Sequence, residues 1–216
     1  GVKQGLESVV KAAKVAESND LPVKFVLLGN GSENSSLKSL AGGCSTIEFV
    51  DPLPDREYIS AMRAADVLLV NEKDTVAEMS VPSKLTSYFS AGRPVLAATA
   101  AGSITAEEIG LSAAGVRVDP NDASQLLDAI MKLRSDSALR TRLGARGPEF
   151  VARELTRSSA LDLAEQVIGD IANSRGRQPG QLLTTRSARA RRSASNTLRR
   201  MSVVVHRVGR SLRERP

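Results

Sequence analysis

Apolar residues along the first part of the chain alternate between two spacings, as they do in a repeating strand–helix fold. Short continuous apolar runs predict buried strands, and they lie at residues 23–28, 47–50, 67–70, 95–98 and 116–118. Apolar residues at steps of three and four predict helices, and these fall near residues 6–16, 59–65, 82–91 and 104–111. Strands separated by helices predict an α/β fold with a doubly wound parallel sheet.

Beyond the last predicted strand the apolar pattern is purely helical. Three stripes of apolar residues at helical spacing begin at Leu126, Leu139 and Ala164. Between the second and the third stripe, Pro148 predicts a break or a kink, because proline removes a helix hydrogen bond. We therefore expect C-terminal helices to follow the sheet.

Charge divides the chain into two parts. The net charge is +6 over 216 residues, but residues 174–216 carry twelve arginines and only one acid, Glu214. That segment has a net charge of +11, which leaves −5 for residues 1–173. The sequence thus predicts a mildly acidic globular domain at 1–173 and an arginine-rich flexible tail at 174–216.

The end of this tail has a helical spacing of its own. Apolar residues at steps of three and four are Leu198, Met201, Val205, Val208 and Leu212. They predict an amphipathic helix over 197–213 surrounded by arginines, of the type that binds an anionic membrane surface. The alternatives are a disordered solubilising tail and nucleic-acid binding, which is disfavoured because the tail has no aromatic residue to stack on bases.

Composition excludes several kinds of site. The single cysteine, Cys44, and the single histidine, His206, exclude an intrachain disulfide and are too few for a Cys/His metal site. No apolar run approaches the roughly 20 residues of a membrane span. We expect a cytoplasmic protein, peripheral on the inner face of the plasma membrane. Because the chain starts at Gly1 without a methionine, we also expect it to be a piece of a longer protein.

The segment VPSKLTSYFSAGRPVLA, residues 81–97, carries the clearest indication of a ligand. It places Ser83 and Lys84 in the first turn of a predicted helix. A cation at this positive end of the helix dipole is slightly unfavourable unless an anion joins it. Unpaired N–H groups, a hydroxyl and an ammonium together favour a phosphate. The alternatives are a capping role for Ser83 and a solvent-exposed Lys84.

The other loops that follow predicted strands are less specific. Gly29-Asn30-Gly31 resembles the start of a dinucleotide fingerprint, but Asn34 stands where the third glycine belongs, so a plain glycine turn is favoured. The loop at 51–55 has the residues of a turn and a helix cap. Glu72, Lys73 and Asp74 open an unusually polar loop, which we interpret as solvated rather than as a ligand contact.

Six segments, taken in order, resemble the donor-binding C-terminal half of retaining family-4 glycosyltransferases of the GT-B fold. The segments are KQGLE at 3–7, FVLLGNG at 25–31, FVDPLP at 49–54, ISAMRAADVLLV at 59–70, PSKLTSYFSAGRPVLA at 82–97 and GVRVDP at 115–120. The branch that they resemble most builds bacterial exopolysaccharide, capsule or O-antigen and includes the colanic-acid-type enzymes. The resemblance covers about residues 1–173 and implies a Rossmann-like domain.

This resemblance implies that a sugar passes, with retention, from a nucleotide diphosphate sugar to a lipid-linked or polysaccharide acceptor, without a metal or other cofactor. The donor phosphates would meet Ser83 and Lys84, with Gln4 at the position of a phosphate-binding lysine and Lys3 beside it. The loops that carry Gly29, Gly31, Leu53 and Pro54 would surround the base. An N-terminal domain that binds the acceptor would precede Gly1, so the chain alone would bind the donor without catalysing transfer.

The sequence departs from the family at its pair of glutamates, which are separated by seven residues. Their positions hold Met79 and Ser87. Glu78, one residue from the first position, is expected to reach the donor sugar, and Ser87 to make one hydrogen bond to the ribose. No residue is identified as catalytic with certainty. The open alternatives are a nucleotide-sugar epimerase of the same fold and a non-catalytic nucleotide-binding module whose basic tail binds nucleic acid.

Overall fold

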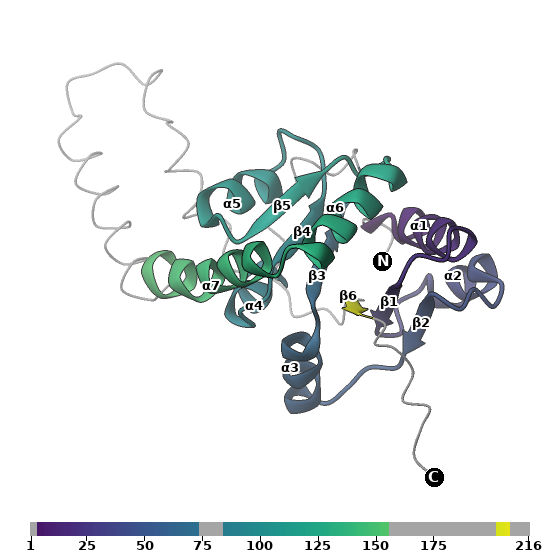
Figure 1. Ribbon diagram of the computed structural model, residues 1–216. Helices are drawn as coiled ribbons and strands as arrows, with labels where there is room; N and C mark the ends of the chain where they lie inside the picture. The colour runs from purple at the N-terminus through teal and green to yellow at the C-terminus, as the bar shows by residue number, and fades with distance from the viewer. Residues whose placement is uncertain (1–3, 74–83, 156–201, 208–216) are drawn as a thin grey trace, which may run out of the picture.

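One six-stranded sheet forms the centre of the computed structural model, which describes residues 4–73 and 84–155 and the backbone of residues 202–207 (Figure 1). Its strands are β1 (Val23–Leu28), β2 (Ile47–Val50), β3 (Val67–Asn71), β4 (Val95–Ala98), β5 (Gly115–Val118) and β6 (Ser202–Arg207). They follow the order β2-β1-β6-β3-β4-β5. Strands β1 to β5 are parallel, and β6 is antiparallel to both of its neighbours. The predicted α/β fold with a doubly wound sheet is confirmed.

Helices cover both faces of this sheet. The helices are α1 (Leu6–Ser18), α2 (Asn34–Ala41), α3 (Asp55–Ala64), α4 (Lys84–Ser90), α5 (Ile104–Ser112), α6 (Ala123–Ser135) and α7 (Ser137–Glu154). Buried residues of α1, α2 and α6 form one apolar cluster, and those of α3, α4, α5 and α7 form a second. Alternate residues of β1 enter the two clusters, with Phe25 and Leu27 in the first and Leu28 in the second. The strands are therefore buried on both faces, which explains their continuous apolar runs.

Helix α7 corrects the expectation of a break at Pro148, because the helix runs through this residue. It packs in backbone contact with α4 and the turn after it. A Cβ added to Gly147 would lie 2.5 Å from the carbonyl oxygen of Phe89, and one added to Gly144 would lie 2.6 Å from that of Gly92. Phe150 also meets Phe89 edge to face, with ring centroids 5.6 Å apart. This packing keeps the proline-containing turn helical.

The sequence analysis missed α2, and the predicted amphipathic helix over 197–213 is wrong at residues 202–207, which form β6. Three consecutive valines, Val203 to Val205, favour a strand because β-branched side chains lose freedom in a helix. The backbone of this segment pairs with β1 on one side and with β3 on the other, which also favours a strand. Residues 156–201 and 208–216 lie outside the described residues, as do the third apolar stripe and the expected domain limit at 173. No helix in the described ranges is long and apolar enough to cross a membrane.

Candidate functional site

Polar groups gather where the parallel strands end. Gly29 follows β1, the loop 51–54 follows β2, Glu72 and Lys73 follow β3, and Thr99 follows β4. In parallel strands these carboxyl ends lie at one edge of the sheet, which is where doubly wound folds bind ligands. Helices α1 and α4 also begin at this edge.

The turn before α1 is fixed to the end of β3 by Asn71. The Asn71 side-chain amide donates hydrogen bonds to the carbonyl oxygens of Gln4, at 2.6 Å, and Gly5, at 3.0 Å. Ser8 donates in turn to Asn71 Oδ1, at 3.3 Å. Asn71 is only 5% exposed, so water cannot easily replace these bonds. The site thus contains a positioning residue that the sequence analysis did not identify.

Lysine 73 lies against the same turn. Gly5 has a φ of 55°, a conformation that favours glycine, and a Cβ there would lie 2.9 Å from Lys73 Cγ. Both the backbone conformation and this close contact therefore require glycine. The Lys73 ammonium reaches Glu7 Oε1 at 3.7 Å, with both side chains more than a third exposed. Gly5 offers no side-chain acceptor to the first N–H groups of α1. An ammonium and a helix N-terminus therefore lie together at the end of β3.

Glutamate 72 is held in place, which corrects our interpretation of it as part of a solvated loop. Its carboxylate accepts hydrogen bonds from the hydroxyls of Thr99, at 2.6 Å, and Thr105, at 2.9 Å. The Thr99 hydroxyl also lies 2.8 Å from that of Ser103, which caps α5. These three hydroxyl residues are at most 3% exposed. Glu72 thereby links the loop after β3 to the loop after β4 and to the start of α5.

The glycine turn after β1 is closed by Asn34, the residue that replaces the third glycine of the fingerprint. The Asn34 side-chain amide donates to the carbonyl oxygen of Gly29 at 3.1 Å, and its backbone N–H donates to that of Gly31 at 2.9 Å. Gly29 N–H donates to the carbonyl oxygen of Val50 at 2.9 Å. The turn is thus joined to the end of β2, next to the loop that carries Leu53 and Pro54.

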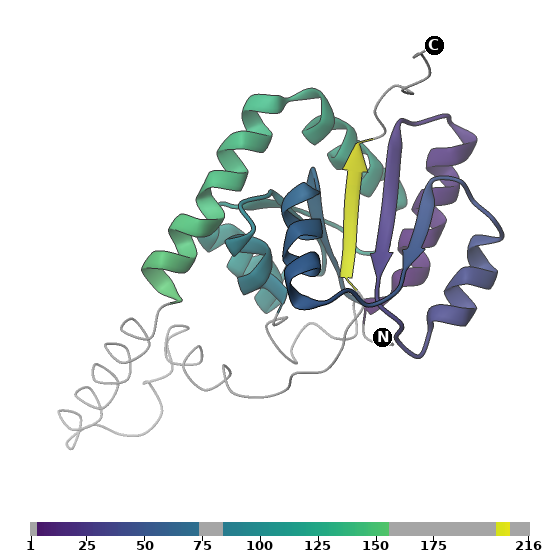
Figure 2. The ribbon, with the colours of Figure 1, turned by 90° about the horizontal axis from the view of Figure 1, so that it is seen from below.

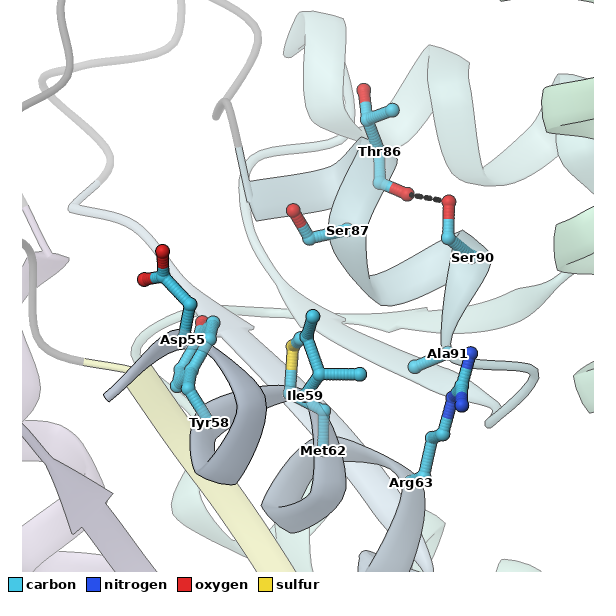
Figure 3. Close-up of a pocket in the computed structure, with 9 residues that line it drawn as sticks. All are labelled: Asp55, Tyr58, Ile59, Met62, Arg63, Thr86, Ser87, Ser90 and Ala91. Carbon is cyan, nitrogen blue, oxygen red and sulfur yellow. Dashed lines mark hydrogen bonds between the residues drawn. The ribbon is translucent and has the colours of Figure 1, made fainter. Parts of the chain in front are cut away.

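That loop leads into a groove between α3 and α4 with a volume of about 440 Å³ (Figure 3). Leu53 is half-buried against the second apolar cluster, and Pro54 is the exposed residue that precedes α3. The residues that line the groove are Asp55, Tyr58, Ile59, Met62, Arg63, Thr86, Ser87, Ser90 and Ala91. Figure 3 shows Asp55 and Ser87 at the same end of the groove and Arg63 at the other.

Among the other predicted site residues, Lys84 is the half-buried first residue of α4. Lys3, Glu78, Met79 and Ser83 lie outside the described residues. The structure therefore brings Gln4 to Asn71, and it brings the predicted ribose residue Ser87 to the groove after Pro54. The sequence analysis did not predict three of the residues described above, namely Asn71, Glu72 and Asp55. The sequence shows only that they are polar and that they lie at or directly after the end of a buried strand or at the start of a helix.

Comparison with known proteins agrees with this architecture. Residues 2–150 match the family described as glycosyl transferases group 1. The chain is 34% identical over 95 residues to WcaI of Escherichia coli K12, described as a colanic acid biosynthesis glycosyl transferase; the match covers 43% of this chain and 23% of WcaI. Overall, the chain spans between 23% and 34% of the length of the curated relatives it matches.

Two solved structures show the same fold. The C-terminal domain of LpcC, a glycosyl transferase group 1 family protein of Francisella tularensis, is 22% identical with a TM-score of 0.59, covering 73% of this chain and 82% of that domain. HepE of Anabaena in complex with UDP-glucose is 15% identical with a TM-score of 0.59, covering 80% of this chain and 46% of HepE. The fold is thus that of one half of a GT-B glycosyltransferase. Because the family match extends over residues 2–150, well over half of the sequence, the chain belongs to the glycosyl transferases group 1 family.

Proposed function

We propose that this chain is the donor-binding half of a retaining hexosyltransferase of family 4, which uses a nucleotide diphosphate sugar. The observation that carries the proposal is the turn at Gln4 and Gly5, held by Asn71 at the end of β3 with the ammonium of Lys73 beside it. Membership of the glycosyl transferases group 1 family supports sugar transfer. The structure of HepE with UDP-glucose supports a nucleotide sugar as the donor.

The diphosphate would be bound at the carboxyl edge of the sheet. The N-terminus of α1, Lys73 and Lys84 offer N–H groups and two ammonium groups to phosphate oxygens. The ion pair of Lys73 with Glu7 is long and exposed, so a dianionic ligand can compete with it. Lys3 and Ser83, outside the described residues, are proposed to add to this site. These fixed charges would stabilise the diphosphate as it leaves the sugar.

The nucleoside is proposed to lie toward α3 and α4. Ser87 replaces the usual ribose-binding glutamate, and Asp55 at the same end of the groove supplies the carboxylate, with two acceptor oxygens, that a serine hydroxyl does not have. The base would contact Leu53 and Pro54, near the turn of Gly29 and Gly31. Glu78 and Met79, outside the described residues, are proposed to contact the sugar.

The acceptor is proposed to be a lipid-linked or polysaccharide chain of the cell envelope. The resemblance to WcaI, described as a colanic acid biosynthesis enzyme, supports exopolysaccharide synthesis. The chain spans at most about a third of its curated relatives, and an acceptor-binding domain other than residues 1–216 is proposed to take part in transfer. The membrane role of residues 198–213 is not carried forward, because six of them form β6.

Calorimetry with a nucleotide sugar and with the free nucleoside diphosphate tests this proposal. The chain should bind UDP- or GDP-sugars, and Glu78→Gln should weaken binding of the nucleotide sugar while leaving the free nucleoside diphosphate nearly unaffected. An exposed acid that already pairs with Arg153, Glu154, provides the matched control variant Glu154→Gln, which should change neither affinity. Binding of no nucleotide sugar would contradict the proposal. An equal loss for both ligands in Glu78→Gln would remove the sugar contact.

A further inference from the structure

The ion pair between Lys73 and Glu7 lies at the carboxyl edge of the sheet, where the diphosphate is proposed to bind. Figure 2 shows β1 and β2 pointing toward the end of the sheet at which α1 begins. Glu7 is the acidic residue in the first turn of this helix, and Lys73 follows β3. The Lys73 ammonium and Glu7 Oε1 are 3.7 Å apart, so the two charges attract each other without a short hydrogen bond. A negative charge of the protein itself therefore lies at a site proposed for an anion.

The stem of Lys73 is held in place independently of Glu7. A Cβ built on Gly5 would lie 2.9 Å from Lys73 Cγ and 3.6 Å from its Cε, so the methylene chain runs over the Gly5 turn. That turn is tied to β3 by the hydrogen bonds from Asn71. The Lys73 side chain is 38% exposed, so solvent reaches it. A phosphate can therefore replace Glu7 as the partner of the ammonium while the stem stays on the turn.

A purely structural role also accounts for an acid at this position. A carboxylate in the first turn interacts favourably with the helix dipole, and an exposed ion pair adds little to stability. Both effects concern the stability of α1. A structural role therefore predicts that loss of the Glu7 charge leaves anion binding unchanged or weakens it, whereas competition for Lys73 predicts tighter binding.

The donor and the product of the proposed reaction differ by one negative charge. Each phosphate of a nucleotide diphosphate sugar carries one charge, about −2 in total. When the sugar passes to the acceptor, the bond between its anomeric carbon and the phosphate oxygen breaks, and the oxygen keeps the electron pair. The acceptor hydroxyl releases its proton as its oxygen bonds to the sugar. The free diphosphate then carries about −3 above roughly pH 6, where its terminal phosphate ionises a second time.

We propose that Glu7 is a specificity-determining residue that weakens binding of the free nucleoside diphosphate more than binding of the nucleotide sugar. Its carboxylate competes with phosphate oxygens for the Lys73 ammonium, and it repels each negative charge of the ligand. The repulsion grows with the charge of the ligand, so the product is affected most and leaves more readily. This inference rests on the function proposed above, because it takes Lys73 as a partner of the diphosphate.

Calorimetry of Glu7→Gln with UDP and UDP-glucose tests the inference, with GDP and a GDP-sugar in their place where the chain prefers guanosine. The variant should bind the free diphosphate about 5-fold and the nucleotide sugar about 2-fold more tightly than the unaltered chain does. The matched control is Glu48→Gln, which breaks the ion pair with Lys24 near the amino ends of β1 and β2 and should change neither affinity. Affinities of Glu7→Gln that are unchanged or lower, or a gain no larger for the diphosphate than for the sugar, would overturn the inference.

A double variant shows whether the effect passes through Lys73. In Lys73→Ala the ammonium for which Glu7 and phosphate compete is gone, so adding Glu7→Gln should tighten binding of the diphosphate by less than about 2-fold. A gain as large as in the unaltered background would overturn the role of the ion pair. If the unaltered chain binds none of these ligands, both the proposed function and this inference are wrong. If it binds them and Glu7→Gln binds them no more tightly, only this inference is wrong.

Discussion

At the scale of single residues, Asn71 determines how the site is held. Its partners in the hydrogen bonds, Gln4 and Gly5, are 67 and 66 positions away in the sequence. A polar residue at the end of a buried strand is visible in the sequence, but its partners are set only by the fold. Lys84 and Ser87, in contrast, belong to one short segment, and their role in the site stays a prediction from it.

Replacing Asn71 by alanine should lower both stability and affinity. The carbonyl oxygens of Gln4 and Gly5 lose the hydrogen bonds from the buried Asn71 amide, although Ser8 still donates to Gly5, and this loss costs about 1–3 kcal/mol in the free energy of unfolding. The turn before α1 loosens, so a nucleotide diphosphate should bind more weakly. Urea unfolding and calorimetry measure the two effects, with the exposed Asn19→Ala as the matched control. A variant that retains the stability and affinity of the unaltered chain would show that Asn71 does not position the turn.

Glutamate 17 gives the stability a dependence on pH. The pKa of this carboxyl is lowered, mainly by the hydrogen bond from the Ser45 hydroxyl and then by that from the Ser45 N–H. A carboxyl with a lowered pKa stabilises the fold above its unfolded pKa of about 4.3, and this contribution is lost as the pH falls toward the folded value. Glu17→Gln should therefore lose stability at pH 6 but show a flatter dependence between about pH 5 and pH 3. Parallel pH profiles for both proteins would argue against this role.

At the scale of helices and strands, the sequence predicts well those elements whose limits depend on neighbouring residues in the sequence. Strands β1, β2 and β4 have the predicted limits, because a run of apolar residues is required where both faces are buried. The sequence analysis missed helix α2 because this helix has eight residues and buries only Leu37 and Ala41, too few to give a clear apolar spacing. The wrong expectations at Pro148 and at residues 202–207 depend on contacts distant in sequence. The packing of α7 on α4 keeps Pro148 helical. Pairing with β1 and β3 makes residues 202–207 a strand.

The contact of α7 with α4 can be tested by adding a single methyl group. Gly147→Ala should lower the free energy of unfolding by about 1–3 kcal/mol, because the new Cβ would lie 2.5 Å from the Phe89 carbonyl oxygen. Gly110→Ala in α5 is the matched control, since a Cβ there meets nothing within 4 Å. The control should be neutral or stabilise by up to about 1 kcal/mol. If both variants unfold at the same urea concentration, the two helices do not pack this closely.

At the scale of the whole molecule, family and fold point to the carboxyl edge of the sheet, and the basic side chains there are the basis of the proposed phosphate site. The overall charge of +6 says little about the site, because the tail after residue 173 carries a net charge of +11 and residues 1–173 a net charge of −5. Within the described domain, Lys73 and Lys84 are the basic side chains at the carboxyl edge that the proposed function uses. Donor binding through phosphates is thus the central claim.

Calorimetry of Lys84→Ala with a nucleotide diphosphate sugar tests this claim most directly. A charge-assisted hydrogen bond contributes about 1.5–3 kcal/mol, so the affinity should fall by roughly 10- to 100-fold. Lys132→Ala is the matched control, because this exposed lysine lies in the last turn of α6, which runs from the carboxyl edge of the sheet toward the opposite one. The account predicts that Lys132→Ala binds as the unaltered chain does. Equal affinity of Lys84→Ala and the unaltered chain would contradict it.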